Sequence, residues 1–364
     1  MKILTVLGTR PEIIRLSLVM KKLDQLASKH IIVHTGQNFT YSLSEVFFRE
    51  LGLRKPDYML SDKQESLGSQ MAIMFQRIEQ ILQAEKPDKV LLLGDTNSAL
   101  SAILAERMGI PVVHMEAGNR CFDLSVPEEK NRRVIDAISS YNMPYTRQSK
   151  DHLVREGFPS HRIILTGNPI YEVLLHYQDR IEKSTVMETL ELASGHYLLA
   201  TVHRAENVDR PAPLREIMEG LNRIAKNTAM RIILSVHPRT RSRLAAVSDL
   251  KLHPLVELHE PFGFFDFVKL EQHAACVLTD SGTVQEECCI FRVPTVTVRN
   301  STERPETVDC GSNVVSGVDA DCIESAAQVM MAAPTDWDCP QGYLDTDVSA
   351  KVVKFLLGGK GYVS

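Results

Sequence analysis

Residues 279–306 combine a turn, acids and arginines that suit the binding of a nucleoside diphosphate. The Ser281-Gly282 pair separates an apolar run, expected to be a strand at 274–278, from an expected helix, and Ser281 is a good helix N-cap residue. Glycine at such a turn lets a ligand approach backbone N–H groups, and a helix N-terminus attracts an anion. On its own, the Ser-Gly pair would indicate no more than a capped turn.

The charged residues that follow this turn extend the pattern. Glu286 or Glu287, one turn into the helix, can accept hydrogen bonds from ribose hydroxyls. Arg299 and Arg304, on the loop after the next strand, can balance the charge of phosphate groups. The turn, the acids and the arginines together predict a nucleotide diphosphate site.

Three charged residues in the first half, Arg10, Asp95 and Glu116, each follow an apolar run with the length of a strand. We expect these strands, at 2–7, 30–35, 89–93 and 111–115, to alternate with helices in a parallel sheet. Because the carboxyl ends of parallel strands meet at one edge of the sheet, the three side chains are expected to converge on a site. Glu128 lies at the start of a later helix, where an acid is common and by itself indicates no function.

The second half repeats this alternation, and a histidine follows each of two expected strands. His203 follows residues 197–202, and His237 follows residues 231–236. His203 fits anion binding or proton donation beside a diphosphate. Phe262 belongs to a group of phenylalanines expected to lie mostly in the core, although one member of the group can stack on a base.

Composition excludes several functional classes. A length of 364 residues is sufficient for two domains, and a net charge of −5 argues against a general nucleic-acid-binding protein. The seven cysteines lack CxxC spacing, which favours reduced thiols in a cytoplasmic protein. We expect no signal peptide, no membrane-spanning helix, no metal site and no bound NAD, since the corresponding sequence patterns do not occur.

The order of expected elements predicts an α/β protein with two Rossmann-like domains. We place the first domain at residues 1–168, because a strand expected at 163–167 is followed by a Gly-Asn-Pro break. The second domain is expected at 169–345. Residues 346–364 are expected to form a helix that returns to the first domain.

Seven short motifs occur in order along nearly the whole chain: GTRPE, GDTNS, HMEAGNR, PEEKNR, HRAEN, DSGTVQEE and TERPE. Each motif alone carries little information, but the series resembles the non-hydrolysing UDP-N-acetylglucosamine 2-epimerase family. The resemblance implies a glycosyltransferase-B-like fold, with two domains facing a cleft and a C-terminal helix crossing back. It also implies a homodimer that takes a UDP-sugar, needs no NAD and supplies precursors of surface polysaccharides.

The activity implied by this resemblance is epimerisation at C2 of UDP-GlcNAc or UDP-ManNAc, by loss of UDP to a glycal and its re-addition. The C2 hydrogen is not acidic, so such chemistry needs carboxylates for proton transfer and cations around the leaving diphosphate. The resemblance assigns proton transfer to Asp95, Glu116 and Glu128, and assigns stabilisation of the leaving UDP to His203. The substrate- and UDP-binding residues that it implies are Arg10, Arg15, Arg132, His237, Phe262, Ser281, Gly282, Thr283, Glu286, Glu287 and Arg304.

Three features depart from the common family pattern. Arg15 stands where lysine is usual, which keeps the charge but changes the geometry. Thr283 replaces the second glycine of the usual Ser-Gly-Gly turn. The segment between Glu116 and Glu128 is shorter than in the commonest members.

A further departure concerns regulation and substrate. Members that act on UDP-GlcNAc often bind a second UDP-GlcNAc as an activator, through a Gln-His pair and an arginine. This chain has Gln37-Asn38 and no arginine at 71–74, so we expect no such activation. An alternative substrate is the 6-deoxy-L-talose precursor of UDP-N-acetyl-L-fucosamine. A glycosyltransferase and a non-catalytic nucleotide-sugar sensor are alternatives of other classes.

Overall fold

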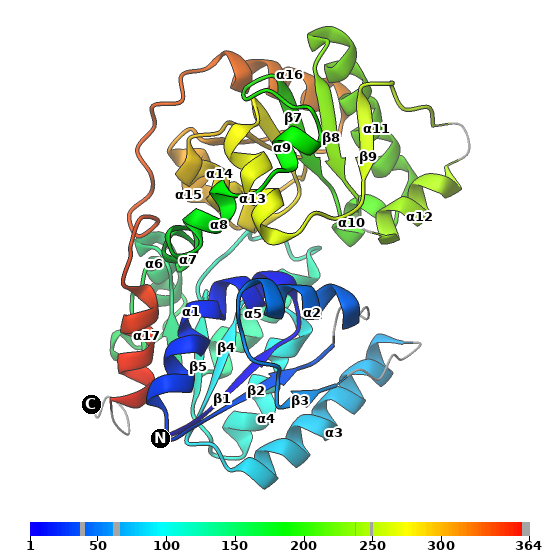
Figure 1. Ribbon diagram of the computed structural model, residues 1–364. Helices are drawn as coiled ribbons and strands as arrows, with labels where there is room; N and C mark the ends of the chain where they lie inside the picture. Colours follow the sequence, from blue (N-terminus) through cyan, green and yellow to red (C-terminus); the bar gives the residue numbers. More distant parts are fainter. Residues whose placement is uncertain (37–40, 61–65, 237, 248–249, 359–364) are drawn as a thin grey trace. The chain divides into compact units, whose positions relative to one another are not determined.

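The chain forms two compact units, each with a six-stranded sheet and helices on both of its faces (Figure 1). The computed structural model describes residues 1–36, 41–60, 66–236, 238–247 and 250–358. The two units comprise Met1–Leu175 with Gln341–Ser364, and His176–Pro340. This architecture confirms the predicted α/β class. The boundaries expected after residues 168 and 345 differ from these divisions by a few residues.

The first unit contains the sheet that carries Arg10, Asp95 and Glu116. Its strands are β1 (Lys2–Leu7), β2 (Lys29–His34), β3 (Tyr58–Met59), β4 (Lys89–Leu93), β5 (Val112–Met115) and β6 (Tyr141–Met143). Its helices are α1 (Arg10–Leu26), α2 (Tyr41–Glu50), α3 (Leu67–Glu85), η1 (Asn97–Ser101), α4 (Ala102–Arg107), α5 (Pro127–Ile138), α6 (Arg147–Arg155), η2 (Ser160–Arg162) and α17 (Val348–Leu357), with α7 (Ile170–His176) at the boundary. All pairs of adjacent strands are parallel, in the order β3-β2-β1-β4-β5-β6.

Both faces of this sheet are buried, which explains why its strands read as continuous apolar runs. Leu4 and Val6 of β1 belong to a core cluster with Met74 and Ile78 of α3. This cluster also includes residues of α4 and α5. Helix α1 packs on β1 and β2, and α17 packs beside α1 (Figure 1).

Helix α17 is fixed to the first unit by polar as well as apolar contacts. The Lys89 ammonium group donates to the carbonyl oxygens of Phe355 (3.2 Å) and Leu356 (3.0 Å) at the end of the helix. At the other end, Glu172 accepts a hydrogen bond from the Ser349 backbone N–H at 2.8 Å. A positive charge at a helix C-terminus is favourable. The C-terminal helix therefore returns to the first unit, as expected.

The second unit has the same kind of sheet. Its strands are β7 (Tyr197–Thr201), β8 (Arg231–Ser235), β9 (Val256–His259), β10 (Cys276–Thr279), β11 (Thr295–Thr297) and β12 (Asn313–Val315). Its helices are α8 (Gln178–Glu182), α9 (Val186–Thr189), α10 (Ala205–Val208), α11 (Pro211–Thr228), α12 (Pro238–Ala246), α13 (Phe264–His273), α14 (Gly282–Phe291), α15 (Pro305–Asp309) and α16 (Ala320–Ala332). The strands are again parallel, in the order β12-β11-β10-β7-β8-β9.

Two apolar clusters cover the faces of the second sheet. One joins Leu198 and Leu278 to residues of α11 and α16, and the other joins Leu199 and Val277 to residues of α13 and α14. Phe267 lies in the second of these clusters, as expected for most of the phenylalanines of this segment. No helix in the described part of the chain has the length and apolar character needed to cross a membrane.

Both sheets have the strand order of a dinucleotide-binding fold when each is numbered from its own first strand. In the first unit the order reverses between β1 and β4, and in the second unit it reverses between β7 and β10. In open α/β sheets, ligands bind at the carboxyl ends of the strands at such a reversal. Arg10 and Asp95 follow the first pair of strands, and His203 and Ser281 follow the second pair.

One predicted strand is wrong. Residues 163–167 do not form a strand; Ile163 makes a single isolated bridge, with Asn142 beside β6. The apolar run instead supplies Ile163 to a small core cluster with Ala117 and Leu153. Gly167 has a left-handed φ of 88°, which is incompatible with continued extended backbone.

We expect Gly118→Ala to destabilise the protein strongly. Gly118 has a φ of 80°, and an added Cβ would lie 2.2 Å from the backbone oxygen of Ser149. The free energy of unfolding should therefore fall by roughly 3 kcal/mol or more, from backbone strain and overpacking together. Urea denaturation measures this change.

Gly109→Ala is the matched control. Gly109 has a similar φ of 75°, but an added Cβ would meet no atom within 4 Å. This variant should lose only about 1 kcal/mol, the cost of the left-handed conformation. Equal losses in the two variants would show that the contact with Ser149 is unimportant.

Candidate active site

Glu12 joins the loops that follow β1 and β4. Its Oε2 accepts hydrogen bonds from the backbone N–H groups of Gly8 (2.7 Å) and Thr9 (2.6 Å) and from the Thr9 hydroxyl (2.9 Å). Its Oε1 accepts a hydrogen bond from the Thr96 hydroxyl at 2.8 Å. Sequence analysis assigned no site role to Glu12, although an acid three residues after Thr9 has the spacing of a capping box.

The Glu12 carboxyl group is fully buried, and burial raises its pKa from the usual 4.5 to about 7. The hydrogen bonds from Gly8, Thr96 and Thr9 lower the pKa but do not offset the loss of solvation. The charge at this position consequently changes close to neutral pH, at the reversal of strand order in the first sheet.

Asp95 is held by α5. Arg132 donates to Asp95 Oδ2 from Nη2 at 2.5 Å and from Nε at 3.1 Å. Asn131 donates to the Asp95 backbone oxygen at 3.0 Å. Arg132, which we expected to bind substrate, is 2% exposed. Its buried positive charge lies beside Asp95, a candidate catalytic carboxylate.

Glu116 follows β5 in a left-handed conformation, with a φ of 67°. Such a conformation is unfavourable for a residue with a Cβ and is concentrated at functional sites. Arg15 of α1, 1% exposed, forms an ion pair with its carboxylate. Arg15, expected to bind substrate, thus contacts a candidate catalytic residue directly.

The first turn of α5 presents two adjacent acids with different surroundings. Glu128 is half-buried, whereas Glu129 is fully buried and accepts hydrogen bonds from the Cys121 backbone N–H (3.0 Å) and Arg132 (2.7 Å). Burial by itself would raise the pKa of Glu129, but the Cys121 N–H and the charge of Arg132 hold it below its usual value. Glu129 is therefore a structural anion, and Glu128 is the less buried of the two acids.

A buried polar network supports the loop that carries Glu116. His114 places Nδ1 2.8 Å from Asp136 Oδ1 and Nε2 2.7 Å from the Gly94 carbonyl oxygen. Asp136 also contacts Arg120 at 2.8 Å and accepts the Gly118 N–H at 3.1 Å. The network joins the ends of β4 and β5 to α5, and sequence analysis did not identify it.

Arg10 lies at the first position of α1, as expected from the GTRPE motif. Its guanidinium group is half-buried and lies over the ring of Phe47, 4.6 Å from the ring centroid. This cation–π contact orients the side chain without neutralising its charge. A phosphate-binding role for Arg10 is compatible with this geometry.

In the second unit, Ser281 occupies the N-cap position of α14, but its hydroxyl makes no capping hydrogen bond within the described residues. The expected side-chain cap is therefore wrong. The Ser281 backbone N–H donates instead to the Thr279 hydroxyl at 3.0 Å. Thr283, in the first turn of α14, is half-buried, and a helix N-terminus is favourable for an anion.

Gly282 is required by the packing of the phosphate turn. A Cβ at this position would lie 2.5 Å from Glu303 Oε1. Glu303 is itself held by Arg204 at 3.2 Å and by Arg299 at 2.9 Å. The carboxylate has little freedom to move aside, so any larger residue at position 282 would disturb the turn.

Glu286 and Arg304 form a buried ion pair with each other. We expected Glu286 or Glu287 to bind ribose and Arg304 to lie near phosphate. Glu287, the other ribose candidate, is 4% exposed. Breaking a buried ion pair is costly, because it leaves one charge uncompensated.

The remaining candidates are a phenylalanine and two histidines. Phe262 is half-buried, and its ring centroid lies 5.7 Å from that of His259. His203 has an exposed side chain whose Nδ1 lies 3.2 Å from Asp280 Oδ1. His237 lies outside the described residues.

Comparison with known proteins identifies the family. Residues 21–357 match the family model described as UDP-N-acetylglucosamine 2-epimerase. The chain belongs to this family. The UDP-N-acetylglucosamine 2-epimerase of Methanocaldococcus jannaschii is 39% identical, with 99% of this chain and 100% of the relative aligned. The UDP-2,3-diacetamido-2,3-dideoxy-D-glucuronate 2-epimerase of Pseudomonas aeruginosa is also 39% identical, with 98% and 99% aligned.

A solved structure supports the same assignment. The crystal structure of the Methanocaldococcus jannaschii UDP-GlcNAc 2-epimerase in complex with UDP-GlcNAc and UDP superimposes with a TM-score of 0.93. It is 39% identical and covers 99% of this chain and 100% of its own. The family predicted from the seven motifs is therefore confirmed, and the protein is an isomerase of the UDP-GlcNAc 2-epimerase type.

Glu12→Gln should remove a pH dependence from the stability of this epimerase. The pKa of Glu12 is 4.5 in the unfolded chain and about 7 in the folded protein, so the folded state holds the proton more tightly. The stability that this proton contributes is complete below about pH 4.5 and is lost as the pH rises through 7. Between pH 5 and pH 8 the wild type should lose up to roughly 3 kcal/mol of unfolding free energy relative to the variant.

Urea denaturation of both proteins at several pH values measures this difference, because titrations common to both cancel. Parallel stability curves for the two proteins over this pH range would contradict the assignment of the titration to Glu12.

Proposed function

We propose that the protein epimerises C2 of a UDP-N-acetylhexosamine, interconverting UDP-GlcNAc and UDP-ManNAc. The observation that carries the proposal is the placement of Asp95 and Glu116, each paired with a buried arginine. They follow the adjacent strands β4 and β5, whose last residues, Leu93 and Met115, are register partners. Two carboxylates at neighbouring strand ends supply what proton transfer at C2 requires.

The proposed reaction removes the C2 proton while the C1–O bond to UDP breaks. The products of this half are a glycal, free UDP and a protonated carboxyl group. Return of a proton to C2 from the other face, with re-addition of UDP at C1, completes the epimerisation. Asp95, Glu116 and Glu128 are the proposed acid–base groups, and no oxidation or reduction occurs.

The proposed UDP-binding residues lie mainly in the second unit. The position of Ser281 to Thr283 at the N-terminus of α14 supports diphosphate binding. Glu286 or Glu287 is proposed to bind ribose, and Phe262 the base. Arg304 is proposed to act through Glu286, because the two form an ion pair. His203 is proposed to stabilise the leaving diphosphate, with Arg10 and His237 as further phosphate ligands.

The relatives support UDP-GlcNAc as the first substrate to test, with the 2,3-diacetamido-glucuronate as the second. Neither relative is named for formation of N-acetyl-L-fucosamine, and family membership disfavours a glycosyltransferase.

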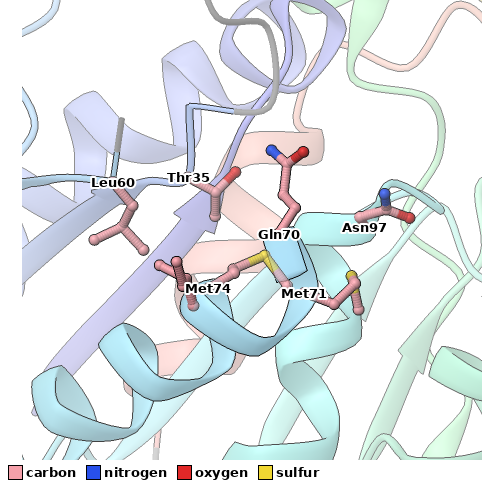
Figure 2. A pocket seen from close by; sticks show the side chains of 7 residues that line it. Thr35, Leu60, Gln70, Met71, Met74 and Asn97 are labelled. Atoms are coloured by element: carbon pink, nitrogen blue, oxygen red, sulfur yellow. The ribbon is translucent and has the colours of Figure 1, made fainter. Parts of the chain in front are cut away.

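A small pocket beside α3 supports the absence of UDP-GlcNAc activation. It is lined by Gln70, Met71, Ile73 and Met74 of α3, with Thr35 and Leu60 from the loops after β2 and β3 and Asn97 from the start of η1 (Figure 2). None of these lining residues is charged, so the described part of the pocket offers a diphosphate no ion pair. Gln37 and Asn38 lie outside the described residues.

A homodimer in the cytoplasm stays a prediction. Light scattering of the purified protein tests the oligomeric state.

Turnover of UDP-GlcNAc in D2O, without an acceptor, should give product with deuterium at C2. The proton removed from C2 exchanges with solvent on the enzyme, and a small amount of UDP and glycal should accumulate. NMR detects the deuterated product, free UDP and the glycal. One parallel reaction uses the UDP-linked diacetamido-glucuronate, and two others use UDP-ManNAc with and without a trace of UDP-GlcNAc. Retention of hydrogen at C2, or a requirement for NAD, would falsify the elimination mechanism; strong activation by UDP-GlcNAc would contradict the argument from the pocket.

Asp95→Asn, Glu116→Gln and Glu128→Gln should each lower kcat by roughly 10²-fold or more, the scale of a lost general acid or base. UDP affinity, measured by calorimetry, should change little, because these groups act on the sugar. Asp151→Asn is the control, since Asp151 is an exposed carboxylate of the same unit. A Glu128→Gln variant as active as the wild type would show that Glu128 is only a helix-terminal charge.

A further inference from the structure

The Asp280 carboxylate is a buried acceptor for the HRAEN segment. Asp280 is fully buried, and its oxygens accept the backbone N–H of His203 at 3.0 and 3.1 Å and that of Arg204 at 2.9 Å. The Asn207 amide adds a further donor at 3.1 Å. The start of this segment therefore surrounds one negative charge.

The same residue immediately precedes the phosphate turn in sequence. Strands β7 and β10 are adjacent, with Thr201 and Thr279 as register partners, and the Asp280 N–H donates to the Thr201 carbonyl at 3.3 Å. The backbone of Asp280 is thus fixed to one strand end while its side chain binds the loop after the other. His203 cannot move relative to the Ser281-Gly282 turn without breaking these bonds.

The side chain of His203 is constrained as well. Its Nδ1 lies 3.2 Å from Asp280 Oδ1, while 46% of the side chain is exposed. A carboxylate at Nδ1 favours a proton on that nitrogen and leaves Nε2 on the opposite edge of the ring for another partner. The partner of one ring nitrogen thereby sets the role of the other.

We propose that Asp280 is a positioning residue that fixes the tautomer and orientation of His203, so that Nε2 serves the diphosphate. This inference rests on the proposed function. When the UDP-sugar binds, the free Nε2 of His203 takes up a proton from solvent, and the resulting imidazolium donates a hydrogen bond from Nε2 to the diphosphate, which gains a negative charge as the C1–O bond breaks. During this elimination no bond to His203 forms or breaks, and the C2 proton goes to a carboxylate as above. The negative charge of Asp280 offsets the positive charge of the imidazolium.

The direct test is 15N NMR of protein labelled in histidine, with His203 assigned by comparison with His203→Gln. In the ligand-free wild type, neutral His203 should carry its proton on Nδ1. Asp280→Asn places an amide donor near Nδ1 and should shift the proton to Nε2. Asn207→Ala is the matched control, because it removes another donor to Asp280 without touching Nδ1, and it should keep the Nδ1–H tautomer.

Kinetics then separates positioning from general support. Asp280→Asn should lower kcat by about 10- to 100-fold, the scale of a lost orienting partner, with a smaller change in KM. Added to His203→Gln, the same substitution should lower kcat by less than about 2-fold further. Equal effects of Asp280→Asn in both backgrounds would overturn the proposal.

The tautomer in the wild type decides the proposal even if Asp280→Asn fails to fold: a proton on Nε2 would overturn it. These spectra need no substrate, so they are independent of the proposed function. An Nδ1–H tautomer in a protein that does not epimerise would leave the positioning of His203 intact and refute the function instead.

Discussion

A buried carboxylate ties two strand-end loops together at the reversal of strand order in each sheet. In the first unit Glu12 accepts hydrogen bonds from the loop after β1 and from Thr96 after β4. In the second unit Asp280, after β10, accepts them from His203 and Arg204 after β7. The ends of parallel strands leave backbone N–H groups without strand partners, and a buried acceptor there satisfies several at once. The site residues of both units depend on this constraint.

Glu12 and the candidate catalytic acids differ in the free-energy cost of carrying a buried negative charge. Glu12 has a pKa raised to about 7 by burial, so its charge is expensive near neutral pH. The candidate catalytic acids Asp95 and Glu116 instead face the buried guanidinium groups of Arg132 and Arg15. These ion pairs hold the two carboxylates in place, and proton transfer at a defined carbon requires such positioning. Removing either arginine would leave a partly buried charge without compensation, so such variants test stability as much as catalysis.

Much of this arrangement could be predicted from the sequence. Strand β4 was expected at residues 89–93 and occurs at Lys89–Leu93, because a strand buried on both faces reads as one apolar run. The positions of Asp95 and Glu116 at strand ends followed from the same pattern. The pairing of Glu286 with Arg304 could not be predicted, because it depends on how the loop after β11 packs against α14.

Local signals also failed where tertiary contacts compete with them. Ser281 has the residue type and position of an N-cap, yet its hydroxyl does not cap α14 within the described residues. Residues 163–167 have the composition of a strand, but Gly167 adopts a left-handed conformation against Asp345. Glu12 and Asp280 were each part of a recognised motif. Their roles as acceptors became apparent only when the donors on the neighbouring strand end were known.

Tertiary contacts also explain the arginine at position 15, where lysine is usual in the family. Arg15 reaches Glu116 with Nη1, and its guanidinium carbon also lies 5.7 Å from the centre of the Tyr145 ring. A planar guanidinium can contact a carboxylate at its edge and an aromatic ring at its face, whereas an ammonium group is a compact point charge. Arginine at this position therefore keeps the positive charge beside Glu116 and adds a second contact that orients it. Glu116 has a φ of 67°, which is a strained backbone conformation. Its ion pair with Arg15 of α1 helps to stabilise the residue in this conformation.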